Sequence, residues 1–178
     1  MRARARTATF TALLLVAILG LAGCGRPRTA ERASVPGDGP ALAATVTHVV
    51  DGDTFDVELA GTTERVRLLG IDTPETVKPD HPVDCYGPEA SARTKALLPA
   101  GTRVLLQRDQ EARDRYGRLL VYAWLADGTF VNGSLVRDGY ADTLSIEPNT
   151  AHRADLSALR AEAKGARRGL WGSCPDDG

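Results

Sequence analysis

Acidic and basic side chains gather in three short stretches whose composition suits chemistry on a phosphate. These are residues 51–53 (Asp-Gly-Asp), 72–75 (Asp-Thr-Pro-Glu) and 114–118 (Asp-Arg-Tyr-Gly-Arg). Carboxylate oxygens are preferred ligands of Ca²⁺, which takes about six to eight oxygen atoms. Each stretch also has a purely structural interpretation, as an Asp-Gly turn, the end of a strand or a charged surface loop. One stretch alone therefore decides nothing.

Together with Arg67, these stretches contain the complementary groups of one reaction. Asp53 and Asp72 can hold a hard cation, and Glu75 can act as a base. Arg67 and Arg118 can each contact a phosphate through two parallel hydrogen bonds. A cation, a base and guanidinium groups are what metal-assisted attack of water on a phosphodiester requires. We therefore expect a site for phosphodiester hydrolysis.

Two other metal sites fit the sequence less well. His81 and Cys85 have a spacing that can ligate zinc, but a single histidine in a proline-rich loop is usually solvated. Residues 51–53 lack the ligand spacing and the closing glutamate of an EF-hand loop. The sequence thus favours a calcium site assembled from separate strands.

Strands that can position these groups are indicated by alternating apolar residues. In the segment 65–71, arginines alternate with apolar residues, and Pro74 has no N–H to give to a sheet. The strand must therefore end in a loop that carries Asp72 and Glu75. Other segments have strand composition as well, namely 45–50, 55–59, 103–107 and 119–125.

Helices are expected between and after these strands. Pro88 suits the first turn of a helix over residues 88–98. Asn132 can cap a short helix that Gly139 ends, and apolar residues at helical spacing follow from about residue 149. The fold class is therefore α+β and rich in β-structure: a small barrel of the oligonucleotide-binding type with α-helices added late in the chain.

The first 23 residues are typical of an export signal. A basic start is followed by an apolar run over residues 13–21. This run is too short to span a bilayer, which needs about 20 apolar residues. Small residues before Cys24 resemble a bacterial lipobox, in which the thiol is lipidated; an ordinary signal cleaved near Gly23 is the alternative. We expect an exported protein that is either secreted or held by a lipid at the outer face of the cell membrane.

The remaining chain divides by composition into three parts. Residues 24–41 are rich in Pro, Gly, Ser and charged residues and suit a flexible tether, residues 42–174 suit one compact domain, and residues 175–178 form a tail. Loss of the three arginines in residues 1–23 changes the formal net charge from −1 to −4. Broad attraction to nucleic acid is thereby excluded, so phosphate recognition requires a local cluster. We expect a monomer.

The three cysteines have separate roles in this scheme. With Cys24 lipidated, Cys85 and Cys174 remain as an even pair in an exported protein. We expect a disulfide between them; two free buried thiols are the alternative.

Five motifs, in order along the chain, resemble those of the staphylococcal nuclease (thermonuclease) family. They are VVDGDT (49–54), RLLGIDTPET (67–76), YGPEAS (86–91), DRYGR (114–118) and VNGSLVRDG (131–139). The resemblance covers about residues 43–171. It implies a five-stranded oligonucleotide-binding barrel with three α-helices. It also implies Ca²⁺-dependent hydrolysis of DNA and RNA that leaves 3′-phosphate ends.

The resemblance implies a set of metal ligands. Asp53 and Asp72 would bind Ca²⁺ together with the backbone carbonyl of Thr73. Asp51 would lie just outside and bond a water on the ion.

Catalytic and nucleotide-binding roles are implied in the same way. Glu75 would orient or deprotonate the attacking water, while Arg67 and Arg118 would hold the phosphate. Tyr116 and Arg115 would contact the nucleotide.

Two other function classes fit the sequence. One is a non-catalytic surface lipoprotein that binds nucleic acid; the other is a structural lipoprotein whose acidic turns bind Ca²⁺ for stability. Arg67, Glu75 and Arg118 are all present, which favours the enzyme, because an inactive relative is expected to lose one of them. Within residues 140–147, Ser and Glu stand where the family often carries tyrosines, so base contacts are the expected point of departure.

Overall fold

The computed structural model describes residues 41–76 and 82–175. The export signal, Cys24, nearly all of the tether, His81 and residues 176–178 lie outside the described residues, so the expectations for them stay predictions. Within the described part of the chain, none of the helices is both long and apolar enough to cross a bilayer.

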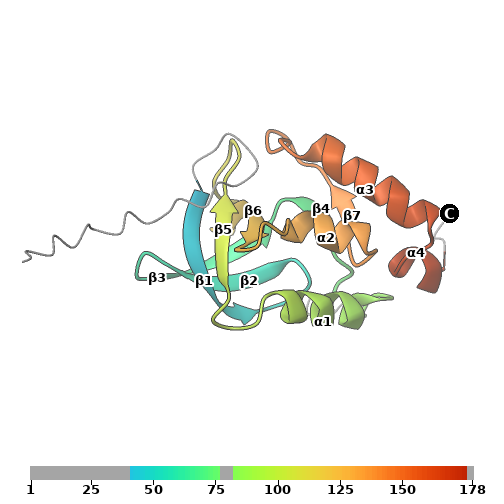
Figure 1. Cartoon of the computed structure of the whole chain (residues 1–178), viewed down its shortest axis with the longest axis horizontal. Helices are drawn as coiled ribbons and strands as arrows, with labels where there is room; N and C mark the ends of the chain where they lie inside the picture. Colours follow the sequence, from blue (N-terminus) through green and yellow to red (C-terminus); the bar gives the residue numbers. More distant parts are fainter. Residues whose placement is uncertain (1–40, 77–81, 176–178) are drawn as a thin grey trace, which may run out of the picture. The chain divides into compact units, whose positions relative to one another are not determined.

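Five strands form a closed barrel in the order β1-β2-β3-β6-β5 (Figure 1). They are β1 (Ala41–Val49), β2 (Thr54–Leu59), β3 (Thr62–Leu68), β5 (Arg103–Gln107) and β6 (Leu119–Leu125). All neighbours are antiparallel except β3 and β6, which run parallel and close the barrel. The expected five-stranded α+β barrel is confirmed.

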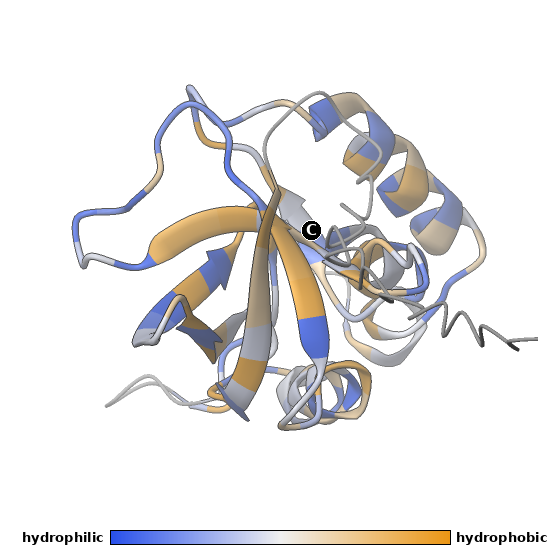
Figure 2. Ribbon diagram, turned by 60° about the vertical axis from the view of Figure 1, so that its left-hand side comes forward, coloured by the Kyte–Doolittle hydropathy of each residue, from blue (hydrophilic) through white to orange (hydrophobic). Residues whose placement is uncertain are grey.

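Alternation along the strands builds the core. Apolar residues alternate with hydrophilic ones on several strands (Figure 2). The inward-facing side chains of Phe55, Val57, Val66, Leu106 and Val121 are fully buried or nearly so. Burial of each such side chain stabilises the folded state by about 1.5–3 kcal/mol. The barrel is therefore a stable scaffold for the loops at its ends.

The strand expected over residues 65–71 is interrupted, which corrects the prediction. β3 ends at Leu68, and a separate β4 (Gly70–Asp72) pairs with β7 (Asp142–Leu144) instead of continuing in the barrel. Gly70, the first residue of β4, has a φ of +75°, a left-handed conformation that turns the chain between β3 and β4. The chain therefore leaves the barrel before β4, which ends at Asp72, and the loop that carries Glu75 follows.

The three expected helices are present as α1 (Gly87–Leu97), α2 (Val131–Arg137) and α3 (Arg153–Gly165), and a short α4 (Leu170–Ser173) follows. The expected cap of α2 is wrong. Phe130 is the N-cap, while the buried Asn132 side chain accepts the N–H of Ala123 and donates to the carbonyl of Leu69. The side chain of this asparagine therefore connects α2 to β6 and to the segment that follows β3. It does not cap its own helix.

Candidate active site

One cavity of about 150 Å³ brings the predicted site residues together. Its lining consists of Asp51, Asp53, Thr54, Arg67, Asp72, Thr73, Pro74, Glu75 and Arg118. The three residues expected to act in catalysis, the three expected metal ligands and Asp51 therefore all lie around one space. Their placement agrees with the sequence analysis, and their roles stay predictions.

Asp53 joins the turn after β1 to the loop after β4. Its side chain is almost fully buried, and its Oδ2 accepts hydrogen bonds from the backbone N–H and the hydroxyl of Thr73 at 3.0 and 3.1 Å. Its backbone N–H donates to Asp51 Oδ1 at 3.1 Å. A Cβ on Gly52 would lie 2.5 Å from the Thr73 hydroxyl oxygen. Glycine at this position therefore lets the two loops meet.

Arg67 bridges the two expected metal-binding carboxylates. Its Nη1 pairs with Asp53 Oδ2, and its Nη2 donates to Asp72 Oδ1 at 2.7 Å. The Arg67 side chain is only 14% exposed, and burial lowers its pKa, whereas the carboxylate of Asp72 raises it. Arg67 therefore holds both carboxylates at the same cavity.

The donor set fits a hard cation. Among residues 41–76 and 82–175, no three His, Cys, Asp or Glu side chains are grouped as metal ligands, so the site would combine two carboxylates with other oxygen atoms. Asp53, Asp72 and the carbonyl of Thr73 offer only oxygen, which suits Ca²⁺ and not a metal that prefers nitrogen or sulfur ligands. The bridging guanidinium marks the point where positive charge is favourable between the two acids.

Asp51 is placed beside this pair. Burial raises the pKa of its carboxyl group, while hydrogen bonds from Thr54 and the charge of Arg67 oppose the rise. Its position next to Asp53 is consistent with the outer role expected for it.

Arg118 is held by its own loop. Asp114 Oδ1 accepts the backbone N–H groups of Tyr116 and Arg118, both at 3.0 Å, and its Oδ2 accepts Arg118 Nε at 2.7 Å. Burial alone raises the pKa of Asp114, but the hydrogen bonds from Arg118 and Tyr116 outweigh it and hold this pKa below its ordinary value. The guanidinium of Arg118 is thus fixed before any ligand arrives.

Tyr116 and Arg115 lie outside the catalytic cavity. They line a neighbouring pocket of about 460 Å³, which shares Arg67 and Arg118 with it. The Tyr116 ring is 69% exposed, and the guanidinium carbon of Arg115 lies 4.7 Å from its centroid. An exposed ring beside cations can contact a nucleotide, as expected from the motif.

The far wall of this neighbouring pocket is aliphatic. Leu144 and Ile146 line it and are 40% and 63% exposed. These side chains lie in the segment where the resemblance led us to expect tyrosines, so this wall of the pocket is aliphatic and not aromatic.

Two residues that the sequence analysis missed hold the loops that contain Gly52 and Glu75. Asp84 Oδ2 accepts the backbone N–H of Glu75 at 2.9 Å, and the Asp84 N–H donates to the Glu75 carbonyl at 2.9 Å. The hydroxyl of Thr94, on α1, donates to the carbonyl of Gly52 at 2.6 Å. No local sequence signal points to either contact, because each joins segments that only the fold brings together.

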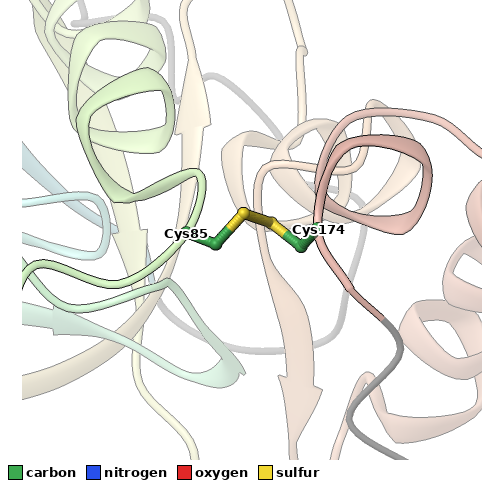
Figure 3. The surroundings of a disulfide bond; sticks show 2 residues. All are labelled: Cys85 and Cys174. Carbon is green, nitrogen blue, oxygen red and sulfur yellow. A yellow bond between two sulfur atoms is a disulfide. The ribbon is translucent and has the colours of Figure 1, made fainter.

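A disulfide joins Cys85 to Cys174, 89 residues further on (Figure 3). Cys85 follows Asp84 directly, and Cys174 follows α4. The covalent link therefore connects the C-terminal end of the described chain to the segment that contacts Glu75.

Comparison with known proteins identifies the family. Residues 65–173 match the family described as staphylococcal nuclease homologue. The chain is 40% identical to a thermonuclease of Staphylococcus intermedius over 77% of this chain and 86% of that protein. It is 39% identical to a thermonuclease of Staphylococcus hyicus, over 71% of this chain and 73% of that protein. It is also 38% identical to endonuclease YncB of Bacillus subtilis, over 71% and 60% of the two chains. The chain belongs to the staphylococcal nuclease family.

Proposed function

We propose that this protein is a nuclease that hydrolyses phosphodiester bonds of DNA and RNA, uses Ca²⁺ and leaves 3′-phosphate ends. The observation that carries the proposal is the bridge of Arg67 between Asp53 and Asp72, in the cavity that Glu75 and Arg118 also line. The thermonucleases and endonucleases among its relatives support the same reaction.

The two arginines provide the phosphate site. Both line the cavity, and each is oriented by a carboxylate, Arg67 by Asp72 and Arg118 by Asp114. Preorganised guanidinium groups stabilise the negative charge that grows on the phosphate during attack, and loss of one such donor costs about 3 kcal/mol. Because the protein as a whole is acidic, this local pair must supply the recognition of phosphate.

Glu75 is the base. Glu75 lines the same cavity, and Asp84 bonds to both its backbone N–H and its backbone carbonyl. The water oxygen forms a bond to phosphorus while its proton goes to this carboxylate; the bond from phosphorus to the 5′ oxygen breaks, and that oxygen leaves as a hydroxyl group after taking a proton from solvent. Asp53, Asp72 and the Thr73 carbonyl would hold Ca²⁺, which, when bound, supplies positive charge and Lewis acidity next to the phosphate.

A cleavage assay tests the proposal. Single- and double-stranded DNA and RNA are incubated with the protein in Ca²⁺ and in a chelator, beside Glu75→Gln. We expect hydrolysis that disappears in the chelator and in the variant. Binding of oligonucleotide without cleavage would favour the non-catalytic module, and protection from unfolding by Ca²⁺ with neither binding nor cleavage would favour the structural lipoprotein.

We further propose export and a lipid anchor at Cys24. The basic start, the short apolar run and the small residues before Cys24 support it, and a disulfide suits an oxidising compartment. Labelling of cells with a palmitate analogue should mark the wild-type protein and not Cys24→Ser. Equal labelling of both would refute the anchor.

A further inference from the structure

A second cleft lies beside the catalytic loop. It has a volume of about 510 Å³, within the range of ligand-binding sites, and Pro74 lines both this cleft and the catalytic cavity. The cleft is also lined by α3, α4, Asp84, Asp142, and by Cys85 and Cys174, which a disulfide joins (Figure 3). A chain that leaves the catalytic cavity past Pro74 therefore reaches this cleft next.

An aromatic ring flanked by two cations dominates the cleft. The guanidinium carbon of Arg160 lies 5.1 Å from the ring centroid of Trp171, and Lys164 Nζ lies 5.2 Å from it. Arg160 and Lys164 are one turn apart on α3, and the indole is partly exposed. Proteins that bind single-stranded nucleic acid without sequence preference combine such cations with an aromatic ring that contacts the bases.

Four charged side chains line the cleft, namely the acids Asp84 and Asp142 and the bases Arg160 and Lys164. Asp142 accepts hydrogen bonds from Arg160 through both carboxylate oxygens, and Asp84 accepts the N–H of Glu75. Within residues 41–76 and 82–175, no carboxylate forms an ion pair with Lys164. An anionic ligand would therefore meet the ammonium group of Lys164 and not a neutralised pair.

We propose that this cleft binds the part of a single-stranded nucleic acid substrate that flanks the bond to be cleaved. Lys164 contacts a phosphate and Trp171 contacts a base, while Arg160, held by Asp142, supports the indole. The inference rests on the proposed nuclease function, because it concerns the same substrate. It gives an acidic protein a second local point of attraction for a polyanion.

Substrate length separates this cleft from the catalytic cavity. Kinetics are measured for a thymidine dinucleotide, chosen because it is too short to extend past the cleaved bond into this cleft, and for a 12-nucleotide oligothymidine, with Lys164→Gln, Trp171→Ala and Trp171→Phe. We expect the first two variants to raise KM for the 12-mer about five- to tenfold with kcat unchanged, and Trp171→Phe to restore part of the loss. The dinucleotide should be cleaved as by the wild type.

The salt dependence of kcat/KM tests whether Lys164 contacts a phosphate, because a purely structural role of Lys164 would leave this dependence unchanged. Removal of one phosphate contact should reduce the slope of log(kcat/KM) against log salt for the 12-mer by about 0.7 in Lys164→Gln. Lys95→Gln is the matched control, because Lys95 is an exposed lysine on α1 that does not line the cleft, and its slope should equal that of the wild type.

Tryptophan fluorescence gives an independent measurement of binding in the Glu75→Gln variant. Trp124 is 2% exposed and lies in the core, so a change on addition of the 12-mer reports Trp171. Unchanged fluorescence would overturn the proposal that this cleft binds nucleic acid. So would a wild-type KM and salt slope in both Lys164→Gln and Trp171→Ala. So would equal losses on both substrates. Ca²⁺ dependence of dinucleotide cleavage tests the nuclease proposal separately.

Discussion

Loss of the Asp84 side chain should weaken catalysis through Glu75. Asp84 Oδ2 accepts the backbone N–H of Glu75 at 2.9 Å. Asp84→Ala removes that acceptor and leaves the Asp84 N–H to the Glu75 carbonyl in place. Asp84→Asn keeps a side-chain oxygen that can accept the same hydrogen bond. The two variants thus separate the contact from the charge.

The size of the effect follows from the burial of the loop. A buried backbone donor without an acceptor costs about 1–3 kcal/mol of stability. Because Glu75 is only half-buried, we expect a penalty of about 1–2 kcal/mol for its N–H in Asp84→Ala. If the loop shifts to satisfy its N–H, the carboxylate of Glu75 moves with it, and the same free energy is lost from the transition state. This corresponds to a decrease in kcat of about 5- to 30-fold for Asp84→Ala and much less for Asp84→Asn.

The assay measures kcat at saturating substrate and Ca²⁺ for both variants, alone and combined with Glu75→Gln. In the Glu75→Gln background, Asp84→Ala should have little further effect, because the group that it positions is already gone. Wild-type kcat in Asp84→Ala would refute the reasoning. An equal further decrease in the Glu75→Gln background would refute it as well, because Asp84 would then act on something other than Glu75.

Three further predictions concern stability and phosphate binding. Reduction, or the double variant Cys85→Ser and Cys174→Ser, should lower the free energy of unfolding by about 4–5 kcal/mol, given the separation of 89 residues, as measured by urea denaturation. Arg67→Lys should lower kcat about 100-fold, because an ammonium group cannot contact two acids and a phosphate as a planar fork does; a change below threefold in the cleavage assay would contradict this. Asp114→Asn should destabilise the protein at pH 7, because a carboxylate whose pKa is lowered by folding stabilises the folded state above its ordinary pKa of 3.8. The difference from the wild type should vanish in urea denaturation as the pH falls through and below that value.

Strand alternation and proline placement predicted the barrel and the loops that carry the site. Pro74 lies in the loop after β4, as expected, and the acids on either side of it line one cavity with Arg118. These features depend on residues a few positions apart, and local rules describe such neighbours well.

The missed features depend on residues far apart in the sequence. Asn132 fits the pattern of a helix cap, yet its side chain bonds to Leu69, which is 63 residues away. Asp84 looks in the sequence like an ordinary polar loop residue. Only folding brings its carboxylate to the backbone of Glu75. Local sequence patterns cannot predict a hydrogen-bond partner that only the tertiary structure brings close.

The parallel pairing of β3 with β6 has a consequence for how this protein can change. Arg67 lies opposite Leu120 in that ladder, and Arg118 directly precedes β6, so the two arginines are offset by two positions on neighbouring strands. Their separation is therefore fixed by backbone register and not by the length of any connection. Insertions or deletions between the two strands can accumulate over generations while the two positive charges keep their spacing, provided that the ladder stays in step.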